Sequence, residues 1–169
     1  KTLNVPPLEF VLDLLYEEDC KVSVIFFNMS EENLARILKW DSVMIGSDSS
    51  LRSLEGVLNY GKPHPRGYGT FSRVIRKYVN ETSILSIEEA IYKMTGFPAQ
   101  TLGLKDRGIL KEGFFADITI FDQETIAEQA TFTSPHNYST GIKHVLVNGK
   151  LTINDGKHES VTNGAILKK

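Results

Sequence analysis

The stretch VSVIFFNMSEENLARILKWDSVMIGSD, residues 22–48, has the pattern of a strand, a helix and a second strand in order. Its first run, residues 22–27, is β-branched and aromatic, which is typical of a strand buried on both faces of a parallel sheet. Ser30 then offers a helix N-cap, and the apolar residues 42–46 predict the second strand. Strands separated by one helix have the spacing of a βαβ unit, so the sequence predicts an α/β fold.

Candidate site residues follow from these two predicted strands, because ligands of such folds bind at the carboxyl ends of the strands. Asp48 comes directly after the second strand, and Phe26, Phe27 and Met29 lie at the end of the first. The aromatic residues suit an apolar pocket. Alternate strand residues point in opposite directions, so we expect at least one phenylalanine in the core instead.

Further helices are predicted around a long loop. Residues 49–69 contain four glycines and two prolines with little periodicity, and loops this long are usually functional or disordered. Apolar residues at helical spacing predict helices over residues 8–19 and 70–79. Ser86 opens a capping box for a third helix over residues 86–96.

The later part of the chain has the character of a β unit. Residues 107–122 and 142–158 predict strands separated by glycine turns, and Asn148-Gly149 is a strong hairpin signal. Between them lies a polar, turn-rich segment, residues 124–141, which we call the connector.

Composition excludes several classes of protein. The 169 residues suffice for one ordinary domain, and the net charge of −2 gives no basic field for nucleic acid. No apolar stretch is long enough to cross a bilayer. A single cysteine, Cys20, fits a reducing, cytoplasmic location, and a start at Lys1 instead of Met leads us to expect part of a longer protein.

Four segments together resemble a known family. They are MIGSD (44–48), GKPHPRGYGTFSRVI (61–75), SIEEAIYKMTGFPAQTLGLKDRGILKEGFFADITIFD (86–122) and HVLVNGKLTINDGK (144–157). The chain resembles the carboxyl-terminal portion of the N-acyl-D-amino-acid deacylases (D-aminoacylases) of the amidohydrolase superfamily. The HPRGYGT loop and the K-M-T-x-x-P-A-Q-x-L-G-L run are the most specific features.

The resemblance implies a fold in two parts. Residues 1–107 would be the carboxyl-terminal part of a (β/α)₈ TIM-type barrel, comprising its last strands and helices. Residues 22–27 would form the seventh strand and residues 43–47 the eighth. Residues 108–169 would supply the carboxyl-terminal strands of a small β-sandwich domain.

The resemblance also implies zinc-dependent hydrolysis of N-acyl-D-amino acids to a D-amino acid and a carboxylate. Asp48 would contact zinc and exchange a proton with the attacking water. Arg66 would bind the carboxylate of this small-molecule substrate through its planar guanidinium. Tyr68, Phe26 and Met29 would line the substrate pocket. From the residues alone, a turn aspartate, a surface arginine and a loop-packing tyrosine stay open as alternatives.

The chain departs from the family pattern at the metal centre. The family also uses a His-x-His pair and a bridging cysteine from early strands, with histidines from middle strands. No histidine precedes His64 here, and Ser49 follows Asp48 where the family commonly has glycine. A catalytic zinc needs about three protein ligands, so we expect this chain alone to be inactive. The other ligands would come from the remainder of a parent chain.

The remaining candidate ligands have no metal-binding spacing. We interpret His136, His144 and His158 as surface or structural residues and Cys20 as a bystander, and we expect His64 to orient its loop.

Two other functions stay open. One is a different amidohydrolase, dihydroorotase-like or dipeptidase-like. The other is a non-catalytic half-barrel assembly module, which would form a homo-oligomer to bury its strand edges.

Overall fold

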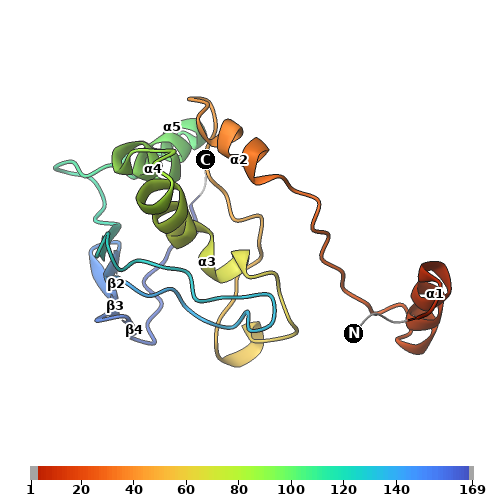
Figure 1. The fold of residues 1–169 in the computed structure, drawn as a ribbon. Helices are drawn as coiled ribbons and strands as arrows, with labels where there is room; N and C mark the ends of the chain where they lie inside the picture. The colour runs from red at the N-terminus through yellow and green to blue at the C-terminus, as the bar shows by residue number, and fades with distance from the viewer. Residues whose placement is uncertain (1–3, 168–169) are drawn as a thin grey trace.

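The computed structural model describes residues 4–167, and Figure 1 shows a set of helices followed by a small sheet. The helical elements are α1 (Pro7–Glu17), α2 (Glu31–Leu38), the 3₁₀ turn η1 (Gly56–Leu58), α3 (Arg66–Arg73), the π-helical η2 (Val74–Glu81), α4 (Ile87–Met94) and α5 (Gly96–Leu102). The strands are β1 (Ile118–Phe121), β2 (Ile142–Val147), β3 (Lys150–Asn154) and β4 (Lys157–His158). No helix within residues 4–167 is long and apolar enough to cross a membrane.

A small apolar core joins α2, η2 and α4. Its buried side chains are Leu38 of α2, Val74 and Tyr78 of η2, Leu85, and Ala90 of α4. Val74 and Tyr78 lie four residues apart on one face of η2, which follows α3 without a break. The core therefore fixes the helix that begins at Arg66.

Two local sequence signals are confirmed. The Ser86 hydroxyl accepts from the Glu89 backbone N–H at 3.1 Å, and the Glu89 carboxylate accepts from the Ser86 N–H at 2.8 Å, which completes the predicted capping box of α4. Asn148 and Gly149 form the predicted hairpin turn between β2 and β3, with φ values of 52° and 75°. Positive φ at both positions is what a tight hairpin turn requires.

The sheet is antiparallel, with strands in the order β1-β2-β3-β4. Asp117, just before β1, accepts from the Asn148 backbone N–H at 2.7 Å and forms an ion pair with Arg107. Arg107 also donates to the Asn148 side chain at 2.6 Å. These contacts join the start of the β unit to its hairpin.

The two parallel strands predicted for residues 22–27 and 43–47 are not formed, which corrects that expectation for this chain. Residues 21–30 run as extended chain, and Phe26 and Phe27 are 75% and 78% exposed instead of buried. A parallel strand needs a neighbour to satisfy its backbone groups, and the described residues offer none at these positions. The division into barrel and β domain stays a prediction.

Residues 40–45 are held by α4 instead of by a neighbouring strand. Lys93 is only 5% exposed, and its ammonium group donates to the carbonyls of Trp40 at 2.5 Å and Val43 at 3.2 Å. The Ile45 N–H donates to the Lys93 carbonyl at 3.1 Å. A buried lysine therefore supports the chain just ahead of Asp48.

The amino-terminal helix α1 confirms the helix predicted over residues 8–19, but none of its residues is buried. Figure 1 shows it apart from the other helices, at the end of the extended residues 21–30.

Candidate functional site

The structure brings together the two residues that the sequence singled out for a site. The Arg66 guanidinium lies 3.0 Å from the Asp48 carboxylate, with Nη2 against Oδ2. The side chain of Arg66 is 44% exposed and that of Asp48 is 91% exposed. An exposed ion pair of this kind contributes at most about 1 kcal/mol to the free energy of folding. Another anion can therefore replace Asp48 at Arg66 with little loss of stability. The roles of both residues stay predictions.

Arg66 is presented by the start of α3, four residues earlier than the predicted helix start. Pro65 precedes it, and a proline is favourable at a helix start because its missing N–H would have no partner there. The Gly69 N–H donates to the Pro65 carbonyl at 3.1 Å, and the Arg66 N–H donates to His64 Nδ1 at 3.0 Å. Burial, and then the charge of Arg66, lower the pKa of His64, which favours the neutral, accepting ring. These contacts support the prediction that His64 orients the loop.

An open groove of about 680 Å³ lies beside Arg66, bounded by residues far apart in the sequence. Its lining residues, which define the groove, are Ile25, Phe26, Phe27, Met29, Glu31, His64, Pro65, Arg66, Gly69, Thr70, Arg73, Glu128, Ala130, Thr131 and Phe132. Three predicted site residues, Phe26, Met29 and Arg66, thus share one cavity. Asp48 is absent from this lining and reaches the groove only through Arg66.

Phe132 is a groove residue that was not predicted from the sequence. Its ring meets that of Phe27 edge-on at 4.8 Å between centroids and that of His64 at 5.0 Å. It lies in the polar connector, where no periodicity marks it. Aromatic pairs at this separation contribute about 0.5–1.5 kcal/mol to stability beyond the burial of their surface. Because Phe132 contacts both Phe27 and His64, it joins the two sides of the groove.

Tyr68, a predicted substrate-binding residue, lines a smaller neighbouring cavity of about 160 Å³ that also includes Arg66. Its hydroxyl donates to the Ser53 carbonyl at 2.7 Å and lies 3.0 Å from His136 Nδ1. Burial is the largest cause that raises the pKa of Tyr68, so the hydroxyl stays protonated. Its hydroxyl is thus occupied by contacts within the chain, and its part in binding substrate stays a prediction.

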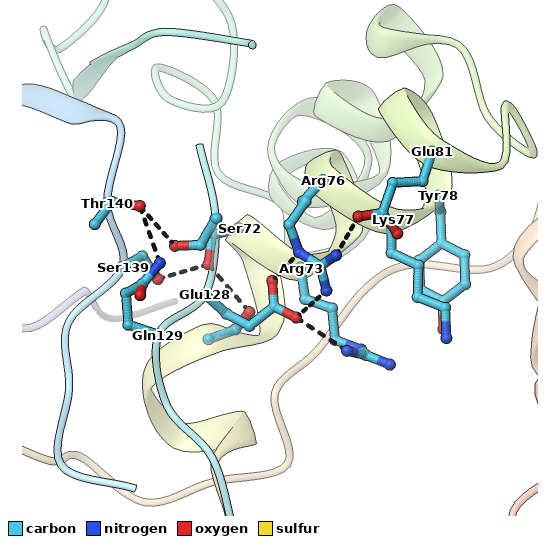
Figure 2. Close-up of polar contacts among 12 residues, drawn as sticks. Ser72, Arg73, Arg76, Lys77, Tyr78, Glu81, Glu128, Gln129, Ser139 and Thr140 are labelled. Carbon is cyan, nitrogen blue, oxygen red and sulfur yellow. Dashed lines mark hydrogen bonds and ion pairs between the residues drawn. The ribbon is translucent and has the colours of Figure 1, made fainter. Parts of the chain in front are cut away.

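Glu128 is the main polar anchor of the groove, and the sequence did not reveal it. Its side chain is only 12% exposed, and its carboxylate accepts from Arg73 at 2.9 Å and from Arg76 at 2.7 and 2.5 Å (Figure 2). Burial alone would raise the pKa of Glu128, but the hydrogen bonds from Arg76 and Arg73 outweigh it and lower that pKa. The hydrogen bond from Glu128 is in turn the largest cause that raises the pKa of Arg76.

Gly69 allows the connector to approach α3 this closely. A Cβ atom at Gly69 would lie 2.6 Å from the Cβ of Glu128, a separation that real side chains do not tolerate. Gly69, the second glycine of the HPRGYGT loop, is therefore needed for packing of the connector.

A second ionic cluster surrounds Glu31 at the start of α2. Its carboxylate accepts from Lys77 at 2.7 Å and from the Tyr78 hydroxyl at 3.0 Å, and Arg73 lies 3.4 Å away. The hydrogen bond from Lys77 is the largest cause that lowers the pKa of Glu31. Burial, and then Glu31, raise the pKa of Tyr78 to about 12. Arg73 thus links Glu31 to Glu128 across the groove.

The described residues do not provide a zinc site. Asp48 is the only predicted metal ligand, and no group of three or more His, Cys, Asp or Glu side chains within residues 4–167 could hold a metal ion. His144 and His158 contact backbone nearby in the sequence: His144 Nδ1 accepts from the Asp155 N–H at 3.3 Å, and His158 Nδ1 accepts from the Ser160 N–H at 3.0 Å. Zinc therefore does not fit on these residues alone.

Comparison with known proteins identifies the family. A sequence profile described as the amidohydrolase family matches residues 41–153. N-acyl-D-glutamate deacylase of Alcaligenes xylosoxydans xylosoxydans is 43% identical over 130 residues, which make up 77% of this chain and 25% of that protein. The crystal structure of a D-aminoacylase matches with a TM-score of 0.77 at 37% identity, over 85% of this chain and 29% of that one.

A further solved structure carries a metal. The N-acyl-D-glutamate deacylase from Bordetella bronchiseptica, in complex with zinc and a phosphonate mimic of the reaction's tetrahedral intermediate, matches with a TM-score of 0.66 at 37% identity. The matched region makes up 80% of this chain and 28% of the Bordetella bronchiseptica chain.

These matches confirm the resemblance to the N-acyl-D-amino-acid deacylases and show a mixed α/β fold with a small antiparallel sheet. The chain spans about a quarter of the length of the curated relatives it matches. A profile match over residues 41–153 covers well over half of the 169 residues. The chain belongs to the amidohydrolase family.

Proposed function

We propose that these residues form part of a zinc-dependent hydrolase that converts N-acyl-D-amino acids to a D-amino acid and a carboxylate. The observation that carries the proposal is the pairing of Asp48 with Arg66 at 3.0 Å beside an open groove. Similarity to an N-acyl-D-glutamate deacylase and a D-aminoacylase supports the same class of substrate.

Arg66 would bind the α-carboxylate of the substrate. A guanidinium offers parallel N–H donors that match a carboxylate, and Arg66 is half-exposed at the groove. In an N-acyl amino acid, the amide nitrogen is bonded to the carbon that also carries the carboxylate. A substrate held by Arg66 therefore has its scissile bond close to Asp48.

Asp48 would act on the proton of the attacking water. A carboxylate can accept that proton and return it to the leaving nitrogen, which then departs as the free amine of the D-amino acid. Its side chain is 91% exposed and is free to leave Arg66 when a substrate carboxylate arrives.

Zinc dependence is part of the proposal for the complete enzyme. The Bordetella bronchiseptica relative was solved with zinc, whereas the described residues here hold too few ligands together. The remaining ligands would come from polypeptide outside these 169 residues. In that enzyme, residues 1–107 would belong to the barrel and residues 108–169 to the small β domain.

The test compares the 169-residue polypeptide with the longer protein that contains it, both supplied with zinc. Release of free amino acid from N-acetyl-D-methionine and N-acetyl-D-glutamate is measured, with the L-isomers as controls. We expect turnover of a D-substrate by the longer protein only. Turnover by the 169 residues alone would show that no ligand is missing, and failure of the longer protein on every N-acyl-D-amino acid would refute the deacylase function.

Replacement of Arg66 separates this function from that of another amidohydrolase. If the bound substrate buries its carboxylate against Arg66, Arg66→Ala should weaken substrate binding by about 2–5 kcal/mol, mainly as a higher KM. Arg66→Lys is the matched control, since it keeps the charge and loses the planar pair of donors. An unchanged KM in Arg66→Ala would remove the carboxylate-binding role.

A further inference from the structure

We propose that His136 is a positioning residue for substrate binding, because its ring ties together both ends of the segment that presents Arg66. This segment, residues 61–68, is called the Arg66 segment. The inference rests on the proposed function, in which Arg66 binds the substrate carboxylate.

One imidazole makes both contacts. His136 Nε2 lies 2.8 Å from the Gly61 carbonyl oxygen, and Nδ1 lies 3.0 Å from the Tyr68 hydroxyl. A carbonyl only accepts, so Nε2 carries a proton and donates to Gly61. The one hydroxyl hydrogen of Tyr68 is donated to the Ser53 carbonyl, so Nδ1 hydrogen-bonds the Tyr68 oxygen when it also carries a proton. His136 is separated by 75 residues from Gly61 and by 68 from Tyr68, so the ring closes the Arg66 segment from a remote part of the chain.

Neighbouring contacts hold the Tyr68 end of the segment in place. Its hydroxyl donates to the Ser53 carbonyl at 2.7 Å, and its ring packs against that of His136 with centroids 5.7 Å apart. Three residues after His136, the Ser139 hydroxyl donates to the Tyr68 carbonyl at 3.2 Å and lies 2.6 Å from the Ser72 hydroxyl (Figure 2). The connector therefore holds both the ring and the backbone of Tyr68.

At the Gly61 end, the neighbouring Tyr60 is contacted by Arg52, whose Nη1 lies 3.5 Å from the Tyr60 carbonyl and whose guanidinium lies 4.5 Å from the Tyr60 ring centroid, but Gly61 itself has little side-chain packing. Gly61 has a positive φ of 63° and nothing within 4 Å of the place where a Cβ would stand. Chain with few packing contacts opens readily, and ordering it on binding lowers affinity. Anchoring of Gly61 by His136 fixes the Arg66 segment before the substrate arrives. Loss of the His136 side chain should therefore weaken substrate binding more than it slows proton transfer at Asp48.

Three variants separate the contact of His136 with Gly61 from its contact with Tyr68. His136→Ala removes both contacts. His136→Gln keeps a donor near the position of Nε2 and so keeps the contact with Gly61, whereas His136→Asn keeps a polar atom near the position of Nδ1. His158→Ala is the matched control, because His158 is an exposed histidine of β4 whose Nδ1 accepts only from the nearby Ser160 N–H at 3.0 Å.

The experiment combines two measurements on the zinc-loaded, full-length protein. Steady-state kinetics on an N-acetyl-D-amino acid give kcat and KM, and hydrogen exchange reports on the amides of the Arg66 segment. We expect His136→Ala to raise KM about tenfold with kcat within about twofold, and to speed exchange in residues 61–68. His136→Gln should recover most of both effects, and His158→Ala should match the unsubstituted protein.

Two results would overturn the inference. One is a His136→Ala protein whose KM and whose exchange in residues 61–68 are unchanged. The other is faster exchange throughout η2 and α4 with kcat and KM altered together, which indicates general destabilisation. Absence of turnover by the unsubstituted protein would defeat the proposed function instead, and the exchange comparison would still decide whether His136 holds the segment. If the alanine variant does not fold, KM and the exchange of residues 61–68 are compared between His136→Gln and His136→Asn. The inference then requires both to be closer to those of the unsubstituted protein in His136→Gln.

Discussion

The two sides of the groove are built differently. On one side, residues 25–29 are an apolar run of extended chain, with Phe26, Phe27 and Met29 each more than 70% exposed. On the other side, residues 128–132 of the connector are fixed to α3 and η2 by Glu128, whose side chain is 12% exposed. The apolar side lacks strand partners, whereas the polar side is firmly anchored.

The difference shows that apolar pattern and structural order are separate properties. An apolar run becomes a buried strand only when neighbours cover its edges and faces, and the described residues supply none beside residues 22–27. A polar segment becomes ordered when its few charged groups find partners of opposite charge in a partly buried place. The connector meets that condition through Arg73 and Arg76.

The largest expected loss of stability comes from a substitution on the polar side of the groove, at Glu128. Glu128→Ala leaves the guanidinium groups of Arg73 and Arg76 without their shared carboxylate and should lower the free energy of unfolding by about 3 kcal/mol. Urea denaturation measures it. The control is Glu124→Ala, an exposed glutamate of the same connector, which should change stability by less than about 0.5 kcal/mol. Equal effects of the two substitutions would mean that the connector is not anchored through Glu128.

The next effect tests the close approach of the connector to α3. Gly69→Ala places a methyl group 2.6 Å from the Cβ of Glu128, so one of the two segments must move. We expect a loss of about 1–3 kcal/mol, although alanine is the better helix former. Gly46→Ala is the control, because nothing lies within 4 Å of the added Cβ. A Gly69→Ala protein more stable than the unsubstituted one would contradict this packing.

Lowering the pH should reduce the stability that Glu128 contributes on the polar side of the groove. The pKa of Glu128 is lowered in the folded chain below its ordinary value of 4.5, so its ionised form contributes stability above that value. The contribution is lost as the pH falls through the folded pKa. The difference in unfolding free energy between the unsubstituted protein and Glu128→Gln should therefore be unchanged near pH 6 and shrink as the pH falls below about 4.5. A difference that stays constant or grows on acidification would contradict the ionic anchor.

The smallest effect is expected on the apolar side. Phe26 is 75% exposed, so Phe26→Ser should change the stability of the 169-residue polypeptide by no more than about 0.5 kcal/mol. Thermal unfolding of the two proteins side by side measures it, with Val74→Ala in the core as the positive control. A loss of more than about 1 kcal/mol from Phe26→Ser would mean that residues 25–29 are packed as firmly as the connector.

Local signals in the sequence predicted the structure best. The capping box at Ser86 and the hairpin at Asn148-Gly149 depend on a few adjacent residues, and both are confirmed. The strands at residues 22–27 and 43–47 were wrong for this chain because strand formation depends on distant partners.

The site was predictable in part. Asp48 and Arg66 were chosen through resemblance to a family, and the structure places them 3.0 Å apart. Glu128 and His136 could not be found, because each acts through contacts more than 50 residues away from a segment without periodicity. A single sequence gives no sign of which polar residues of such a segment will meet a remote helix.

The ion pair between Arg66 and Asp48 has a consequence for the order of events in the proposed enzyme. The carboxylate of Asp48 lies against the guanidinium that a substrate carboxylate would need, so the two carboxylates would compete for Arg66. An arriving substrate carboxylate must displace the Asp48 carboxylate, and that exchange releases Asp48 at the moment when an amide bond is in place to be cleaved. Small carboxylates and high salt should loosen the same pair and release Asp48 without a substrate.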